Sequence, residues 1–299
     1  MNSTSEQQDA QHLRMTTAPV PGLILSLSVP SIITCIITSV YNMADTFFVA
    51  QLGTAAVAAV GVVFSISSVL SALGFWMGTG GSSLVSLYLG AREKEKAHCA
   101  ASTGFFLALG LGCVIATGGL LALEPLMRLL GSTDTILPEA EAYAVPILLA
   151  APFHCSSLAL AQCLRAEGKS KESMAGQLAG GLLNIVLDPL FIYTLGMGIR
   201  GAGAATALSQ VMVWAALLWF YVRGKTSVRI SVRQVARTPR MVKLIFTTGF
   251  PSLCRHCGNA LATIVLNRAA GGFGDAAIAA FSIASRVSGL ALSVSIGFV

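Results

Sequence analysis

Long apolar stretches separated by short polar ones run through most of the chain. Eight of them are long enough to cross a bilayer as helices, at about 22–49, 57–84, 97–123, 143–164, 174–195, 202–222, 244–270 and 276–299. This pattern predicts an all-α polytopic membrane protein. The polar stretch 1–20 is expected to be a disordered cytoplasmic tail, because it lacks the apolar core of a signal peptide.

Composition supports the membrane class and excludes a soluble domain. Of 299 residues, 55% are hydrophobic and 11% are charged, and the mean hydropathy is +0.76. The seven cysteines are scattered, so no disulfide framework is predicted, and the lone Cys254–Cys257 pair predicts no metal site. A net charge of +6 could suggest nucleic acid, but the distribution of the charge indicates membrane orientation instead.

Basic residues concentrate in alternate loops. The second and fourth loops each hold three, at 92–96 and 165–171, and the sixth holds seven within 223–243. The odd-numbered loops hold only Arg128, Arg200 and Arg268. Because basic loops stay in the cytoplasm, the even-numbered loops and the N-terminus are expected on the cytoplasmic side. The membrane is expected to be the plasma (inner) membrane.

The chain contains an internal repeat. Pro30-Ser31 recurs as Pro251-Ser252, and GTAAVAA at 53–59 recurs as GDAAIAA at 274–280, both 221 residues later. Parallel repeats of six helices are a transporter architecture with substrate held between the halves.

We therefore expect four regions: the tail 1–20, a six-helix lobe 21–224, a basic linker 225–241 and the start of a second lobe at 242–299. The linker is interpreted as a solvated connection. The second lobe is expected to be truncated, because Val299 falls opposite Gly78 of the first copy.

Only two of the thirteen acidic residues fall inside predicted spans, Asp45 and Asp188. An acid at membrane depth is a functional-site hypothesis by default, since its charge costs about 2.5–3.5 kcal/mol on insertion scales. Asn184 lies one helical turn before Asp188, and Pro189 directly after it should bend the helix and free the carbonyl of Ile185.

Both acids are predicted in the outer half of the membrane, where Thr206 on the sixth span and Tyr143 at the start of the fourth join them. The sequence thus predicts one polar chamber inside the first six helices. Two acids in low dielectric could exchange a proton, or carboxylate and amide oxygens could bind sodium. The alternative is two independent structural acids, each hydrogen-bonded within its own helix pair.

Other polar residues receive a more limited interpretation. Pro30 is expected to bend the first span, as a hinge or as a static kink. His154 is expected to be a packed, hydrogen-bonded residue. Arg255, His256 and Arg286 are unusual at membrane depth and receive no role.

Four motifs carry a resemblance to a known family: YNMADTFFV at 41–49, LRAEG at 164–168, NIVLDP at 184–189 and GMGIRGA at 196–202. They resemble the multidrug and toxic compound extrusion (MATE) family of secondary transporters, in its prokaryotic DNA-damage-inducible branch. The resemblance implies two six-helix lobes and proton- or sodium-driven export of organic cations.

The resemblance also implies roles for individual residues. It places a cation site on Asp45, Asn184, Asp188 and Thr206, with Tyr143 as a tyrosine of the chamber. Relatives can carry an asparagine on the fourth helix, where this chain has Ala161 and Gln162.

The resulting hypothesis is a cation-coupled multidrug antiporter that works by alternating access, with H⁺ or Na⁺ as coupling ion and no other cofactor. Its partners would be small organic cations and the lipid bilayer, not nucleic acid, and the full-length protein would be a monomer. The alternatives are a lipid-linked precursor flippase, which would need a basic cavity, and an inactive fragment. A membrane hydrolase is disfavoured, because the sequence lacks a credible nucleophile–base pair or metal ligand set. Ser156 and Ser157 are merely adjacent to His154 in sequence, which is a weak signal.

Overall fold

The computed structural model describes residues 19–132, 134–224, 226–235 and 239–271. Apart from two short turns of other helix types, the elements are α-helices. They are α2 Val20–Ala50, α3 Thr54–Gly90, α4 Lys94–Leu121, α5 Leu123–Leu129, α6 Leu137–Ala166, α7 Ser170–Pro189, the π-helical turn η1 Leu190–Thr194, α8 Ile199–Val222, the 3-10 turn η2 Val232–Gln234 and α9 Pro239–Gly271.

The predicted all-α membrane architecture is confirmed. Within the described residues six helices are long and apolar enough to cross a membrane, and none of these residues forms a strand. Several helices extend beyond the predicted spans, for example α3 and α6, because helical backbone continues past the apolar segment into its polar flanks. The seventh predicted span falls on α9, whereas the eighth span, the repeat copy at 274–280 and Arg286 lie outside the described residues.

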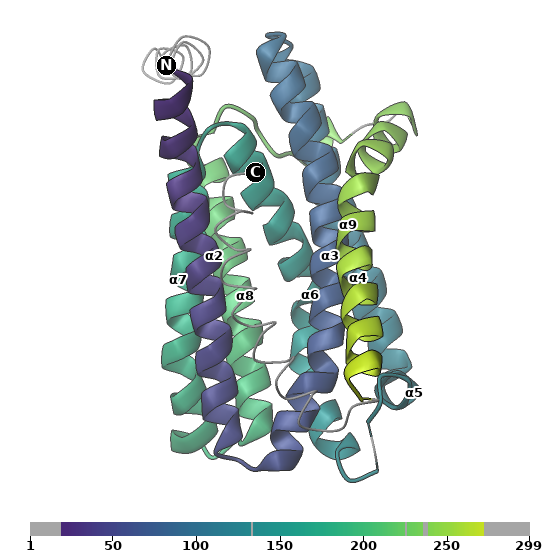
Figure 1. Cartoon of the computed structure of the whole chain (residues 1–299). Coiled ribbons are helices and arrows are strands. Elements are labelled where there is room, and N and C mark those ends of the chain that lie inside the picture. The colour runs from purple at the N-terminus through teal and green to yellow at the C-terminus, as the bar shows by residue number, and fades with distance from the viewer. Residues whose placement is uncertain (1–18, 133, 225, 236–238, 272–299) are drawn as a thin grey trace.

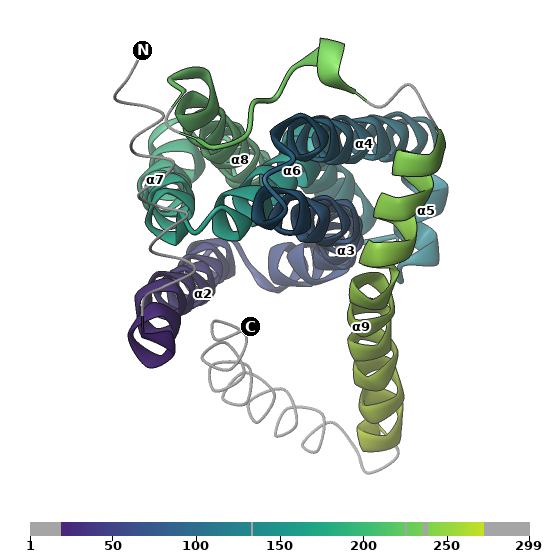
Figure 2. The ribbon, with the colours of Figure 1, turned by 90° about the horizontal axis from the view of Figure 1, so that it is seen from above.

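The helices pack around α6, which contacts α3, α4 and α8 (Figures 1 and 2). At one edge of the bundle α2 packs mainly on α7 and touches α3 only slightly. At the other edge α9 packs on α3 (Figure 2). Many large apolar side chains are exposed on the surface, including Val114, Leu121 and Phe64, as expected for a surface that faces lipid.

Small residues let α6 approach its neighbours closely. A Cβ added at Gly112 of α4 would lie 2.6 Å from Cα of Pro152, and one added at Gly74 of α3 would lie 3.2 Å from Cα of Cys155. Lipid tails provide no hydrophobic driving force between helices, so such backbone proximity is a main source of packing energy in membranes.

The contact between α3 and α9 is also made by backbone. A Cβ at Gly80 would collide with the carbonyl oxygen of Ile245, and a Cβ at Gly249 would collide with that of Trp76. The Trp76 indole Nε1 donates to the carbonyl oxygen of Phe246 at 3.0 Å, and the two rings meet edge to face. The first helix of the second repeat is therefore fixed directly against the first six-helix unit.

The linker after α8 is not simply solvated, contrary to the sequence interpretation. Residues 226–231, which we call the strap, cross the ends of α4 and α6. The backbone N–H of Ser227 donates to the Glu167 carboxylate just after α6, that of Arg229 donates to His98 Nδ1 at 3.1 Å, and that of Ser231 donates to Ser102 Oγ at 3.1 Å. Val228 is fully buried. The linker binds here because side chains in the first turns of α4 and just after α6 accept its backbone donors.

Candidate functional site

The predicted site residues gather at one end of the bundle. Asp45 lies five residues before the end of α2, and Asp188 lies six before the end of η1. Tyr143 and Thr206 lie six and seven residues after the starts of α6 and α8. Tyr143 therefore does not open its helix, as the sequence suggested, because α6 begins earlier, at Leu137. Since neighbouring spans alternate in direction, these positions bring four helices to a common depth.

Asp45 is tied to α6 rather than to its own helix. The Tyr143 hydroxyl donates to Asp45 Oδ2 at 3.3 Å, and both residues are buried. Tyr143 also shares a hydrogen bond with Thr206 of α8. One phenol thus links the acid of α2 to two further helices.

Asp188 has its nearest partner on its own helix. Asn184 Nδ2 donates to Asp188 Oδ1 at 3.2 Å and lies 3.5 Å from Thr206 Oγ1. Asp188 is fully buried and Asn184 is 2% exposed. Asp45 and Asp188 are close enough to interact electrostatically. The alternative of two independent acids therefore fits the hydrogen bond of Asp188, which stays within one helix, but not that of Asp45. The five predicted residues form one cluster, which we call the acid cluster: Asp45, Tyr143, Asn184, Asp188 and Thr206.

Three oxygen atoms of the acid cluster have no hydrogen-bond partner among the described residues. They are Asp45 Oδ1, Asn184 Oδ1 and Asp188 Oδ2, all buried. A buried acceptor without a donor is costly, so such atoms in a functional protein are expected to meet a ligand, a proton or water. Carboxylate and amide oxygens are also the donors that hard cations prefer. No group of three or more His, Cys, Asp or Glu side chains within the described residues could hold a metal ion.

The backbone next to Asp188 is altered by Pro189. The α-helical pattern of α7 ends at this proline and continues as the π-helical turn η1. Proline cannot donate to the carbonyl of Ile185, and single π turns accommodate such interruptions and are frequent at functional sites. Pro30 lies within the continuous helix α2, where Thr34 Oγ1 donates to its carbonyl at 2.9 Å.

The residues weighed for a hydrolase do not form a nucleophile–base pair. The Ser156 hydroxyl donates to the Pro152 carbonyl at 2.6 Å, and that of Ser157 donates to the His154 carbonyl at 2.8 Å. The His154 ring instead contacts Ser71 and Gln210. His154 is hydrogen-bonded, as expected, but its partners come from two other helices, and no spacing in the sequence indicates them.

Near the other end of α6, Gln162 contacts α3 and its own helix, and its Nε2 lies 3.5 Å from Thr79 Oγ1. Its Oε1 accepts from the guanidinium of Arg165 at 3.0 and 2.8 Å, one turn later in the same helix. Among the residues that the structure describes, the side chain of Gln162 therefore makes no hydrogen bond to the acid cluster.

Comparison with known proteins gives the family. A family model described as MatE matches residues 30–190, more than half of the chain. The chain belongs to the MATE family. The match includes the first two site motifs, YNMADTFFV and LRAEG, and ends just after NIVLDP, so it covers Asp45, Asn184 and Asp188.

Named relatives of this MATE-family chain are export proteins. The multidrug export protein MepA of Staphylococcus saprophyticus is 29% identical over 265 residues, which are 88% of this chain and 59% of that protein. MepA of Staphylococcus aureus strain MRSA252 is 25% identical over 281 residues, 94% of this chain and 62% of that protein.

Solved structures show the same fold. A MOP-superfamily transporter from Pyrococcus furiosus is 33% identical, with a TM-score of 0.87 over 92% of this chain and 62% of that one. A structure described as the outward-facing conformation of a multidrug resistance MATE family transporter matches with the same TM-score, identity and coverage. The chain thus spans about three fifths of the length of these relatives.

Proposed function

We propose that this chain forms part of a cation-coupled multidrug antiporter that exports amphipathic organic cations by alternating access. Asp45 and Asp188 exchange the coupling ion, and Asn184, Thr206 and Tyr143 provide its polar surroundings. The observation that carries the proposal is the set of three buried, partnerless oxygens on Asp45, Asn184 and Asp188. The printed names of the relatives, multidrug export proteins, support the substrate class.

The same oxygens serve either coupling ion. A carboxylate pair in low dielectric takes up a proton readily, because the second negative charge is unfavourable beside the first. For sodium, two carboxylate oxygens and one amide oxygen provide hard ligands. Loss of the ion leaves negative charge that favours an organic cation, which gives the exchange its physical basis. An acidic chamber also weighs against a flippase for lipid-linked phosphates, which would need basic residues there.

The test of this function is dye efflux from proteoliposomes. The longest reading frame that contains this chain is reconstituted, a fluorescent organic cation is loaded, and a pH gradient or a sodium gradient is imposed separately. We expect efflux with one of the two gradients and none when the gradient is collapsed by an ionophore. Efflux that is equally fast without any ion gradient would contradict coupling.

Orientation forms part of the proposal: the N-terminus and the strap lie in the cytoplasm of a cell with an inner membrane. The charge distribution of the loops supports this. A membrane-impermeant maleimide is expected to label Thr135→Cys in intact cells and Lys94→Cys only after permeabilisation, each measured against the unmodified chain. The reverse labelling pattern would invert the topology.

A further inference from the structure

A second polar cluster lies inside the lobe, apart from the acid cluster. It joins three helices: His154 of α6 lies between Ser71 of α3 and Gln210 of α8. Its Nε2 is 3.0 Å from Ser71 Oγ, and its Nδ1 is 2.9 Å from Gln210 Oε1. All three residues are partly exposed.

This cluster connects to the acid cluster. Gln210 shares a hydrogen bond with Tyr41 of α2, and Tyr41 interacts electrostatically with Asp45. Tyr41 lies one turn before Asp45, and Gln210 lies one turn after Thr206. In the proposed orientation both bridging residues lie on the cytoplasmic side of the acids.

The direction in which the single hydroxyl hydrogen of Ser71 points distinguishes two protonation states of the histidine. Ser71 Oγ is 2.8 Å from the Ser67 carbonyl oxygen as well as 3.0 Å from His154 Nε2, but a hydroxyl has only one hydrogen. When that hydrogen points to Ser67, Nε2 must donate to Oγ. Because Nδ1 donates to Gln210 Oε1, the ring then carries both protons and is positive.

When the Ser71 hydroxyl turns toward Nε2, the ring is neutral with its proton on Nδ1. Both states use the same positions of the heavy atoms and differ only in one proton and one hydroxyl rotation. The backbone N–H of Ser71 donates to the Ser67 carbonyl in either state, as in any α-helix. The carbonyl therefore keeps a partner when the hydroxyl turns away, and the rotation costs little.

We propose that His154 is a proton-binding site of this lobe, separate from Asp45 and Asp188, with Ser71 as its rotating hydrogen-bond partner. On protonation the incoming proton binds Nε2, and the Ser71 hydroxyl rotates so that its hydrogen points to the Ser67 carbonyl. Release reverses both steps. The Gln210–Tyr41 pair places this site in series with the acid cluster on its cytoplasmic side.

Few other titratable groups lie in the middle of the helices around the histidine. On α2 these are Cys35, Tyr41 and Asp45, and on α6 itself Tyr143 and Cys155, whose thiol donates to the Leu70 carbonyl. In α3 the only titratable side chain is Tyr88, and in α8 they are Arg200 and Tyr221, all near helix ends. In α4 Cys113 interacts with Cys155. The Asp45 carboxylate interacts with Tyr41 at the far end of this bridge, and Asp188 of α7 lies beyond it in the acid cluster. The other carboxylates of α4 and α6 lie near the starts of these helices, at Glu95, Glu139 and Glu141.

The test is nuclear magnetic resonance of ¹⁵N-histidine in the full-length protein in nanodiscs. The chain has four histidines, and the His154→Gln variant identifies the signal of His154 by its loss. As pH falls from 8 to 5 we expect that signal to pass from a neutral ring protonated at Nδ1 to a doubly protonated ring. A ring that stays neutral down to pH 5, or a neutral form protonated at Nε2, would overturn the proposal.

Two variants at Ser71 separate proton binding from simple packing. Ser71→Ala removes the acceptor for Nε2–H, so the midpoint of the His154 titration should move to lower pH, and Ser71→Thr should restore it. An unchanged midpoint in Ser71→Ala would contradict the proposed partner. This inference builds on the cation-coupled function but does not share its test, because the titration is observed whether or not the protein transports dye.

Discussion

Proteoliposomes that carry Asp45→Asn or Asp188→Asn are expected to lose gradient-driven dye efflux down to the background of empty vesicles. Asparagine keeps the size of aspartate and one acceptor oxygen, so Tyr143 or Asn184 retains a hydrogen-bond partner. The substitution removes the charge and the exchangeable proton, which are the two properties that coupling needs. Each single variant should abolish coupling, because one acid alone can neither raise the proton affinity of a partner nor complete the set of oxygen ligands.

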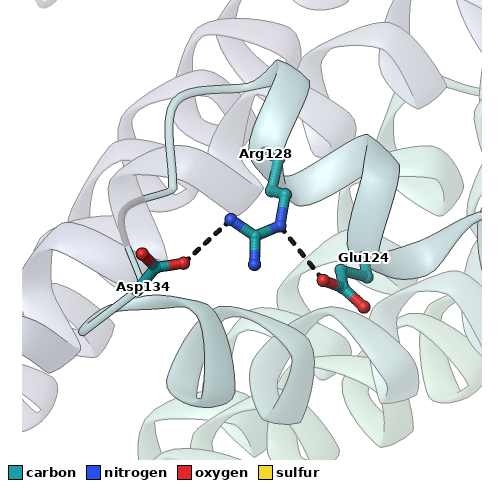
Figure 3. A network of polar contacts seen from close by, with 3 residues as sticks. All are labelled: Glu124, Arg128 and Asp134. Atoms are coloured by element: carbon teal, nitrogen blue, oxygen red, sulfur yellow. Dashed lines mark hydrogen bonds and ion pairs between the residues drawn. The ribbon is translucent and has the colours of Figure 1, made fainter.

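The matched control is Asp134→Asn. Asp134 accepts from Arg128 Nη1 at 2.8 Å in a surface network that also includes Glu124 (Figure 3), and its side chain is 85% exposed. Exposed ion pairs contribute little to stability, so this variant should transport like the parent. Full efflux in both acid-cluster variants would remove the coupling role from Asp45 and Asp188, whatever their hydrogen bonds.

Removing the charge of Glu167 is expected to stabilise the protein at high pH by about 3 kcal/mol relative to the parent, and not at low pH. Glu167 lies just after α6 and is 4% exposed. Burial raises its pKa to about 7 despite hydrogen bonds from the backbone of Ser227 and Val228. The folded protein therefore binds the proton more tightly than the unfolded chain, whose glutamate has the ordinary pKa of 4.5.

This difference sets the pH window. Below pH 4.5 the Glu167 carboxyl is neutral in the folded and the unfolded protein, so its burial does not lower the free energy of unfolding. As pH rises from 4.5 to about 7, the carboxyl ionises in the unfolded chain first, and the free energy of unfolding falls. Thermal unfolding in detergent should therefore give equal midpoints for the parent and Glu167→Gln near pH 4 and a higher midpoint for the variant at pH 8. Glu93→Gln, which removes an exposed ion pair with Lys96, should change neither. A Glu167→Gln variant that is less stable at pH 8 would show that the strap needs the charged acceptor.

Much of the fold was predictable because membranes impose a simple rule. Every spanning segment must be helical and mostly apolar, so its length can be read directly from the sequence. The same rule singled out Asp45 and Asp188, since a carboxylate in such a segment stands out. The matching depths of these acids with Tyr143 and Thr206 followed from counting residues to the helix ends.

What could not be predicted depends on contacts between segments distant in sequence. Glu167 was assigned to a loop, and only the fold shows that the strap buries it. The bridge from Ser71 through His154 to Gln210 joins three helices whose spacing in the sequence carries no signal. The π-helical turn after Pro189 was expected only as a bend, because a proline indicates an interruption but not the way in which the backbone repairs it.

The glycine contact between α3 and α9 also limits how the two repeats can move. With Gly80 and Gly249 the main chains touch without intervening side chains, and Trp76 holds the Phe246 carbonyl beside them. Sliding of α9 along α3 would bring carbonyl oxygens of one helix into Cα atoms of the other, whereas a rotation about the contact would not. We therefore expect the separation of these two glycines to stay nearly constant in any motion of α9 relative to α3.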